Sequence, residues 1–292
     1  MLITGISGLL GGNLNFELRD NFSVFGVSKS NRNHEVENQL LADLSSKSDV
    51  ERIINLIKPD IVIHCAALTS VDFCEINQDL AYRTNVLSTL NIIESIPNTM
   101  RFIYISSDAL FDGEKGLYKE TDVTKTINYY AKTKLESESI VEGKLKNFAI
   151  IRTNMIGFNR IKGESLAEWT IKNLDRGVDF KMFNDVFFSP LFVVTLSNYI
   201  LKIVNSDFVG RINIAASSAI SKYDFGVILA KYLNKDSSLI IPIRVEEYNF
   251  KAKRPKNMSL DVSLAESLFG KLPSVEQEVE KLVSYYKKRN VF

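Results

Sequence analysis

Three side chains near the middle of the chain have the types and spacing needed to move a proton onto a carbonyl oxygen. Tyr130 and Lys134 are four residues apart in a segment with a helical pattern, so both lie on one face of the predicted helix. An ammonium group beside a phenol favours the phenolate, and we therefore expect Lys134 to lower the pKa of Tyr130. Tyr130 would protonate a developing alkoxide, while Ser107 would hydrogen-bond the same oxygen and fix its direction.

The Tyr-x-x-x-Lys pair on its own is weak evidence, because one such pair on a helix surface can arise by chance. Of the 11 tyrosines, only Tyr130 has a lysine four residues later, whereas Tyr129 is followed at that spacing by Thr133. The position of the pair, downstream of a glycine-rich turn at the amino end, favours a catalytic role.

The amino end has the pattern of a dinucleotide-binding turn. A short apolar run at residues 2–4 predicts a strand, and glycines follow at positions 5, 8 and 11 before a helical pattern. Such glycines allow a tight turn, a close approach of a pyrophosphate and close packing of helix on sheet. An ordinary turn is the alternative. The residues predicted to line the cofactor here are Gly5, Ser7, Gly8, Leu9, Leu10 and Gly11.

The next predicted strand, at residues 23–27, suggests which dinucleotide binds. An NAD site usually places a carboxylate near the end of this strand for the ribose 2′-hydroxyl, and none occurs before Glu35. Ser28, Lys29, Ser30 and Arg32 are suited instead to a 2′-phosphate. We therefore predict NADPH as the cofactor, with NADH as the alternative. The loop could also be an ordinary solvated one whose two cations bind no cofactor.

The ends of the later strands should carry the rest of the site, because ligands of open α/β sheets bind beyond the carboxyl ends of the strands. After the run at 61–64 come Cys65, Ala66 and Ala67, small residues that would let the chain pass close to a cofactor, although small core residues would look the same. After the runs at 102–105 and 148–151, the polar residues predicted to contact a substrate are Ser107, Asp108 and Asn154.

Apolar runs of strand length alternate with helical patterns, which predicts an α/β, Rossmann-type, doubly wound parallel sheet with a smaller C-terminal substrate-binding lobe. Helical patterns occur near 9–19, 49–57, 78–95 and 129–142, and later near 165–176, 193–204, 222–233 and 275–289, with a strand at 211–214. We assign residues 1–152, with a returning part near 183–215, to the dinucleotide-binding domain. The substrate-binding lobe would comprise about 153–182 and 216–292.

Composition excludes several classes of protein. A net charge of +1 argues against a nucleic-acid binder, which usually has a basic surplus. No apolar stretch of 18 residues predicts a membrane span, and no secretory signal precedes the first strand, so we expect a cytoplasmic protein. The two cysteines fit a reducing compartment. The two histidines lie far apart in the sequence, and no Cys/His cluster has metal-ligand spacing, so we predict no metal site.

Taken together, these motifs resemble the extended short-chain dehydrogenase/reductases, and among them the dTDP-4-dehydrorhamnose reductase branch. The resemblance runs nearly end to end. It rests on the glycine turn and on the later segments Ala42-Asp43-Leu44, Lys58 to Ala67, Thr69 to Asp72 with Glu75, Ile105 to Asp108 with Phe111-Asp112-Gly113, Tyr130 to Glu136, and Arg254 to Asn257 with Ser259-Leu260-Asp261.

The resemblance implies hydride transfer from NADPH to the C4 ketone of a nucleotide-linked 6-deoxyhexose. It implies that Ser107 orients the carbonyl, that Tyr130 protonates it, and that Lys134 binds the nicotinamide ribose. Asp43 and Leu44 would flank the adenine, Thr69 would lie at the cofactor, and Arg254 would face the sugar nucleotide. A homodimer is an open alternative for the oligomeric state.

Some positions depart from the branch, and other functions stay open. Ser107 stands where threonine is more usual, and Ala109 stands where these reductases often have tyrosine. Ala109 also argues against a sugar-nucleotide dehydratase, which has an acidic pair after the catalytic serine or threonine. The alternatives are another sugar-nucleotide enzyme of the superfamily, such as an epimerase, and a cofactor-binding regulatory subunit like the β subunit of methionine adenosyltransferase.

Overall fold

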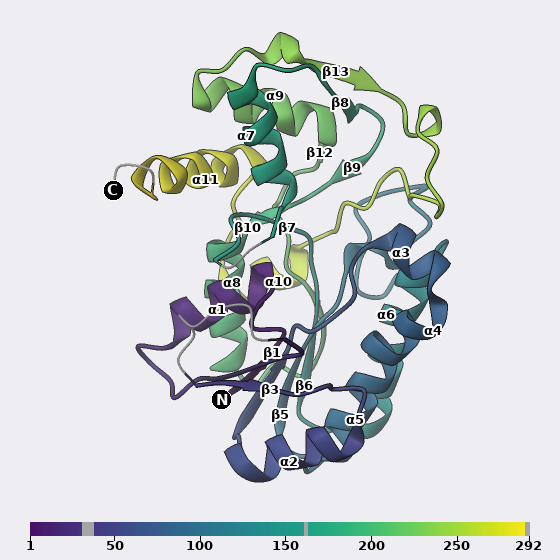
Figure 1. Ribbon diagram of the computed structural model, residues 1–292, viewed down its shortest axis with the longest axis vertical. Helices are drawn as coiled ribbons and strands as arrows, with labels where there is room; N and C mark the ends of the chain where they lie inside the picture. The colour runs from purple at the N-terminus through teal and green to yellow at the C-terminus, as the bar shows by residue number, and fades with distance from the viewer. Residues whose placement is uncertain (31–37, 161–162, 290–292) are drawn as a thin grey trace.

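A parallel sheet of seven strands forms the centre of the computed structural model, which describes residues 1–30, 38–160 and 163–289 (Figure 1). The strand order is β11-β6-β5-β4-β1-β2-β3, and every neighbouring pair is parallel. These strands are β1 (Leu2–Thr4), β2 (Phe25–Ser28), β3 (Gln39–Leu41), β4 (Ile61–His64), β5 (Arg101–Ile105), β6 (Phe148–Arg152) and β11 (Gly210–Asn213).

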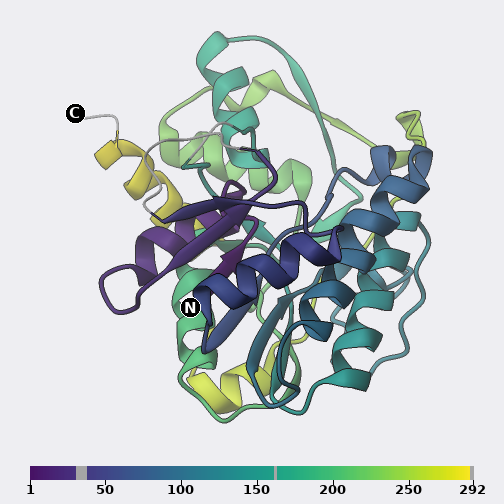
Figure 2. The ribbon, with the colours of Figure 1, turned by 60° about the horizontal axis from the view of Figure 1, so that its bottom comes forward.

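Helices cover both faces of this sheet because its strands are apolar on both sides (Figure 2). Successive strand residues point to opposite faces, so Phe102 belongs to one buried cluster and Ile103 to the other. The first cluster includes side chains of α2 (Lys47–Ile57), α5 (Ser88–Glu94) and α6 (Tyr129–Lys144), and the second those of α1 (Leu9–Leu18) and α8 (Val193–Val204).

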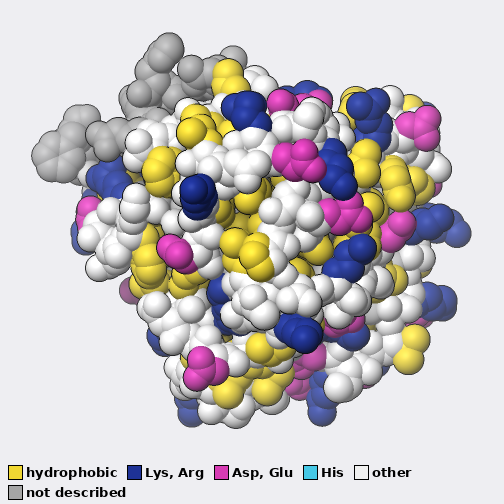
Figure 3. Space-filling view, turned by 90° about the horizontal axis from the view of Figure 1, so that it is seen from below, with side chains coloured by type: hydrophobic (Ala, Val, Ile, Leu, Met, Phe, Trp, Pro, Cys, Tyr) yellow, Lys and Arg dark blue, Asp and Glu magenta, His cyan; other side chains and the backbone are white. Residues whose placement is uncertain are grey.

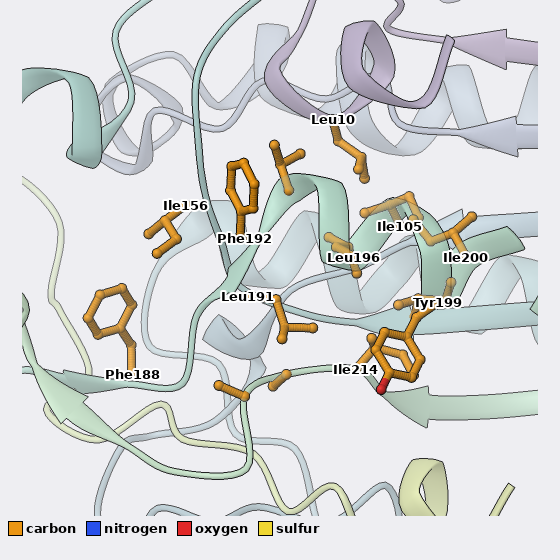
Figure 4. Packing of buried hydrophobic residues seen from close by; sticks show 14 of the residues in the cluster. Leu10, Ile105, Ile156, Phe188, Leu191, Phe192, Leu196, Tyr199, Ile200 and Ile214 are labelled. Carbon is orange, nitrogen blue, oxygen red and sulfur yellow. The ribbon is translucent and has the colours of Figure 1, made fainter. Parts of the chain in front are cut away.

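The second cluster continues from the sheet into the C-terminal part of the chain. Figure 4 shows Leu196 and Ile200 of α8 among Leu10 of α1 and Ile105 at the end of β5. Leu196 and Ile200 are four residues apart on α8 and fully buried, as expected for the inward face of an amphipathic helix. Helix α8 therefore anchors the C-terminal part of the chain to the central sheet.

The remaining elements build the part drawn above the sheet in Figure 1. Its helices are α7 (Leu166–Arg176), α9 (Lys222–Leu233) and α11 (Val275–Arg289). Three two-stranded sheets lie among them, formed by β8 (Phe180–Phe183) with β13 (Ile240–Ile243), β7 (Met155–Ile156) with β10 (Leu191–Phe192), and β9 (Phe187–Phe188) with β12 (Ile220–Ser221). Helix α10 (Ser263–Phe269) precedes α11.

The predicted alternation and fold class are confirmed, with differences in detail. The helix expected near 78–95 consists of α4 (Gln78–Tyr82), a π-helical turn η1 (Arg83–Leu87) and α5. Helices α3 (Val71–Ile76) and α10 and the short strands, including β3, were not predicted from the sequence. The 3₁₀ turns found among the described residues are η2 (Asp108–Leu110), η3 (Ser237–Leu239) and η4 (Val245–Glu247).

The surface seen from below the sheet is mixed in character (Figure 3). Acidic and basic side chains alternate with apolar ones there, and neither sign of charge gathers into a continuous patch. Across residues 1–30, 38–160 and 163–289, no helix is both long and apolar enough to cross a bilayer. Within the same ranges, no group of three or more His, Cys, Asp or Glu side chains is placed to hold a metal ion.

Candidate active site

The glycine turn lies where the order of the strands reverses direction. The chain moves outward from β1 through β2 to β3, and then crosses to β4 on the other side of β1, which opens a crevice between β1 and β4. Gly5 follows β1 with a φ of +69°, and a Cβ atom there would lie 2.7 Å from the backbone N of Ala66, which follows β4. Only glycine fits this close approach of two strand ends.

A buried hydrogen-bond network holds these two strand ends together. His64 Nδ1 lies 2.6 Å from Thr4 Oγ1, and His64 Nε2 lies 3.0 Å from Thr89 Oγ1. Thr89 donates its proton to Asn85 O, so Nε2–H of His64 donates to Thr89 and Nδ1 accepts from Thr4. Burial lowers the pKa of His64 to about 3, with Lys134 acting in the same direction, so the ring is neutral. Thr4 Oγ1 also accepts the N–H of Ala66 (3.2 Å), which fixes the loop after β4.

A cavity of about 300 Å³ opens above this crevice. Of the residues predicted to contact the cofactor, those that line it are Gly5, Ser7, Gly8, Ser28, Lys29, Asp43, Leu44, Cys65, Ala66 and Ala67. Ser30, expected at the 2′-phosphate, lines it as well, and the lining residues that were not predicted are Val27, Ala42, Ser45, Thr84 and Ser88.

Six described residues that were predicted at the cofactor do not line this cavity, namely Leu9, Leu10, Gly11, Thr69, Tyr130 and Lys134. Leu9 and Leu10 pack against the core, and Thr69 is exposed outside the cavity. Gly11 is buried, and a Cβ atom there would collide with Gly5 O, so its role is close packing of α1 against the turn. Arg32 lies outside the residues that the structure describes.

A carboxylate does lie beside the end of β2: Asp43, expected at the adenine, is paired with Lys29, and this pairing was not predicted. The strand β3 pairs with β2, and the chain that leaves it carries Asp43, whose Oδ2 forms an ion pair with Lys29 Nζ at 2.8 Å. The hydrogen bond from Lys29 lowers the pKa of Asp43 to about 2. The edge of the cavity therefore carries both a cation and an anion, each of which can select a ribose substituent.

The polar residues after β5 and β6 meet at the edge of the sheet, as predicted. Ser107 Oγ donates to Asp108 Oδ1 (3.2 Å) and accepts from the N–H of Ala109 (3.1 Å). Asn154 Nδ2 donates to the other carboxylate oxygen of Asp108 at 2.7 Å. Burial raises the pKa of Asp108 to about 6, and the hydrogen bond from Asn154 opposes this shift. Asp108 thus holds the Ser107 hydroxyl and the Asn154 amide in fixed positions.

Helix α6 brings Tyr130 and Lys134 to the same side of the site. The helix begins after Asn128, whose side chain accepts the N–H of Ala131 (2.9 Å) as an N-cap. Tyr130 and Lys134 are both buried on the inward face of this helix. Lys134 Nζ donates to Ile105 O (2.6 Å), the last residue of β5, and lies 4.2 Å from the centre of the Tyr104 ring.

The expectation that Lys134 lowers the pKa of Tyr130 is wrong for this structure. Burial raises the pKa of Tyr130 to about 12, with Asp108 and Cys74 adding to the shift and Ser107 opposing it. Burial lowers the pKa of Lys134 itself to about 7, opposed by Glu138 and Cys65. The reason is that both groups are removed from water, which disfavours the charged form of each. Tyr130 is therefore protonated near neutral pH and has a proton to donate.

A second cavity of about 320 Å³ lies over Ser107 and Tyr130. The predicted substrate residues Ser107, Asp108, Asn154 and Arg254 all line it. Arg254 Nη2 forms an ion pair with Asp72 at 2.9 Å, and its guanidinium lies 4.4 Å from the centre of the Phe250 ring. The other terminal nitrogen, Nη1, is buried and has no hydrogen-bond partner among the described residues.

The sequence analysis missed most of the apolar wall of this cavity and one charged residue. These residues are Val71, Phe183, Val186, Lys222, Val245, Phe250, Pro255 and Met258, and the polar Asn128 was missed as well. Most lie in the C-terminal part of the chain, on short strands and turns without a sequence signal of their own. Ala109, whose departure from tyrosine was expected to alter the sugar pocket, does line the cavity. Leu68 packs in the same buried cluster as Tyr130, and the chain from Cys65 to Leu68 thus leads from the first cavity to the second.

Comparisons with known proteins agree with this geometry. The chain is 28% identical to a dTDP-4-dehydrorhamnose reductase from Aggregatibacter actinomycetemcomitans over 98% of each chain. It is 29% identical to methionine adenosyltransferase 2 subunit beta from Xenopus tropicalis, over 91% of this chain and 81% of that protein. The crystal structure of dTDP-4-dehydrorhamnose reductase from Bacillus anthracis in complex with NADP superposes with a TM-score of 0.88 at 26% identity, covering 97% of this chain and 98% of that one.

The family assignment rests on one further finding. The RmlD substrate binding domain family matches residues 1–288, which is nearly the whole chain. The resemblance inferred from the glycine turn and the Tyr-x-x-x-Lys helix is thereby confirmed, and the chain belongs to the RmlD substrate binding domain family of extended short-chain dehydrogenase/reductases.

Proposed function

We propose that this NAD(P)-dependent oxidoreductase uses NADPH to reduce the 4-keto group of a nucleotide-linked 6-deoxyhexose. The observation that carries the proposal is the pocket over Ser107 and Tyr130, reached from the glycine-turn cavity along the chain after β4. A reductase needs these two sites next to each other, one for the cofactor and one for the carbonyl.

The first cavity fits a dinucleotide. The turn at Gly5 and Gly8 exposes backbone at the start of α1, whose first turn carries no acidic side chain, so phosphate would be favoured there. Lys29 at the edge would attract a 2′-phosphate, and Asp43 and Leu44 would border the adenine. When bound, NADPH would supply the hydride, and Lys134 would contact its nicotinamide ribose.

The chain's own residues would handle the carbonyl oxygen. The oxygen of the Ser107 hydroxyl is held by the N–H of Ala109, and its one hydrogen, which points to Asp108 Oδ1, would turn to the carbonyl oxygen of the substrate and orient it. Tyr130 would transfer its phenolic proton to the oxygen as negative charge develops there. The high pKa that burial gives Tyr130 keeps this proton on the phenol until the carbonyl oxygen takes up negative charge.

Arg254 would hold the diphosphate of the substrate. Arg254 lines the cavity, its Nη1 is buried without a partner among the described residues, and an unsatisfied buried donor is costly unless a ligand completes it. An arginine fork is well matched to two phosphate oxygens. The ion pair with Asp72 would keep the fork in place before the substrate arrives.

A cofactor-binding subunit without enzyme activity is the second candidate, favoured by the similarity to methionine adenosyltransferase 2 subunit beta. One experiment separates the two. A panel of dTDP- and UDP-linked 4-keto-6-deoxyhexoses is mixed with NADPH and the protein, and absorbance of the reduced nicotinamide is followed. We expect NADPH oxidation with at least one panel member. Tight NADPH binding without oxidation by any of them would favour the subunit role.

A further inference from the structure

Lys222 is a cation in the substrate cavity to which the proposed function assigns no role. It is the first residue of α9, directly after the capping residue Ser221, and its side chain lines the cavity with Ser107 and Tyr130. A positive charge at a helix N-terminus opposes the helix dipole, which favours anions such as Asp224 in the same turn. The stability of α9 therefore does not explain a lysine at this position.

The ammonium group of Lys222 lacks a polar partner within the described part of the chain. It lies 3.2 Å from the centre of the Phe188 ring, and no carboxylate of residues 1–30, 38–160 and 163–289 is within ion-pair distance. Burial lowers the pKa of Lys222 to about 7, and the charge of Asp108 opposes this shift. Lys222 is half-buried and lines the cavity, so the three donors of its ammonium are available to a ligand that supplies acceptors there.

The neighbours of Lys222 place it near the reacting carbonyl rather than near the diphosphate. Lys222 and Asp108 influence each other electrostatically, and Asp108 is hydrogen-bonded to Ser107. Arg254 instead interacts with the carboxylates of Asp72 and Glu75 on α3. Lys222 therefore lies on the side of the cavity with Ser107 and Asp108, whereas Arg254 lies on the side of α3.

We propose that Lys222 reads the sugar of the substrate by donating a hydrogen bond to a hydroxyl oxygen of the hexose, close to the carbonyl that Ser107 and Tyr130 address. Asp108 would accept a hydrogen bond from the sugar on the same side of the cavity. The substrate class is then a hexose that keeps a hydroxyl at the position facing Lys222, whereas Arg254 serves the diphosphate. This inference rests on the proposed function.

Binding of two matched ligands tests the inference. The probes are the dTDP-linked 6-deoxyhexose dTDP-rhamnose and dTDP alone, titrated by calorimetry into the protein saturated with NADP⁺. Lys222→Met keeps the length of the side chain and removes the ammonium. We expect it to weaken dTDP-rhamnose binding at least tenfold and to leave dTDP and NADP⁺ binding unchanged. Lys231→Met, at an exposed lysine of the same helix, should change none of the three affinities.

The outcomes separate the inference from the proposed function. An equal loss for dTDP and dTDP-rhamnose would place Lys222 at the diphosphate and overturn the inference, as would unchanged affinity for both ligands. Failure of the unaltered protein to bind dTDP-rhamnose, UDP-linked 6-deoxyhexoses or their 4-keto forms would overturn the proposed function, and the inference with it. Retained NADP⁺ binding by Lys222→Met shows that the variant is folded.

Discussion

Tyr130 is the residue on which the proposed chemistry depends most directly. Burial keeps its phenol protonated near neutral pH, and Ser107 and Asp108 are its polar neighbours in the cavity. Its neighbour Tyr129 begins α6 but does not line the cavity, so the two adjacent tyrosines form a natural pair for comparison.

We expect Tyr130→Phe to reduce turnover by about 10²–10⁴-fold, which is the usual contribution of a positioned general acid. NADPH affinity should stay nearly unchanged, because only the phenolic oxygen is lost. Steady-state kinetics with a panel substrate and a separate NADPH titration measure the two effects. Tyr129→Phe should keep turnover close to that of the unaltered protein. Turnover retained by Tyr130→Phe, or equal damage from Tyr129→Phe, would contradict the assignment of the acid.

Lys29 and Asp43 form an ion pair that places opposite charges at the ribose end of the cofactor cavity. Lys29 would attract a 2′-phosphate, and Asp43 would repel it or bind a 2′-hydroxyl. Cofactor preference should therefore depend on the balance between these two side chains.

We expect Lys29→Ala to weaken NADPH binding about tenfold or more while NADH binding changes little, since the variant removes the cation and also releases Asp43 from it. Asp43→Asn should do the reverse and increase the preference for NADPH. Fluorescence titration of both cofactors measures the ratio of affinities. A ratio that moves in the same direction for both variants would show that the charges at this edge do not select the cofactor.

At the scale of elements, the crevice between β1 and β4 depends on the close approach of Gly5 to Ala66. Gly177, the C-cap of α7, has nearly the same positive φ, +62° against +69°. A Cβ atom at Gly177 would meet nothing within 4 Å, whereas one at Gly5 would lie 2.7 Å from Ala66 N. An alanine at Gly177 would therefore suffer only the strain of a positive φ. An alanine at Gly5 would suffer that strain and also a collision of its Cβ atom.

We expect Gly177→Ala to cost about 1–2 kcal/mol in the free energy of unfolding, the cost of a left-handed conformation for an L-residue. Gly5→Ala should cost roughly 1–3 kcal/mol more, because backbone must shift to admit the Cβ atom. It should also weaken NADPH binding, which Gly177→Ala should leave intact. Urea unfolding and NADPH titration of both variants provide the numbers. Equal costs for the two substitutions would mean that the crevice is not closely packed.

The sequence predicted the elements whose patterns are long and regular. Strands such as β4 and β5 are continuous apolar runs, and α6 has both a capping residue and a clear length. The strands of the C-terminal part were missed because most have only two residues, which is too short for an alternation to appear. The π-helical turn η1 was also missed, since it interrupts an otherwise regular helical pattern without a proline or glycine.

In the candidate site, too, some residues could be predicted from the sequence and others could not. Ser107, Tyr130 and the glycine turn were predictable because each belongs to a motif of fixed local spacing. The ion pair of Lys29 with Asp43 and the place of Lys222 in the cavity were not, because tertiary structure alone brings these side chains to the site. The pKa of Tyr130 was predicted in the wrong direction because burial, which spacing does not reveal, is its largest cause.

At the scale of the whole molecule, we propose that residues 1–152 and a returning part near 183–215 form the dinucleotide-binding domain, with the substrate-binding lobe made of about 153–182 and 216–292. The pairing of β11 with β6 supports the returning part. Asp72 of α3 joins the two parts: it accepts the N–H groups of Lys251 (3.0 Å) and Ala252 (2.9 Å) and pairs with Arg254. The loop that carries Arg254 is therefore fastened to the domain that binds the cofactor.

Arg254 lies at this junction, where it pairs with Asp72 and lines the substrate cavity. We expect Arg254→Lys to raise the Michaelis constant for the sugar nucleotide about tenfold or more, because a lysine keeps the charge but loses the planar fork and the free Nη1 donor. A hydrogen bond to a charged group contributes roughly 1.5–3 kcal/mol, and 1.4 kcal/mol corresponds to a tenfold change. The Michaelis constant for NADPH should change little, since the glycine turn lies in the other cavity.

Arg176→Lys, at an exposed arginine near the end of α7, is the matched control and should alter neither constant. Kinetics of both variants, with the sugar nucleotide and NADPH varied in turn, decides between three cases. A rise confined to the sugar nucleotide places Arg254 at the diphosphate. An equal rise for both ligands would mean that Arg254 acts by holding the two parts of the chain together through Asp72. If neither Michaelis constant changed, Arg254 would not bind the sugar nucleotide, and its buried Nη1 donor would not be completed by this ligand.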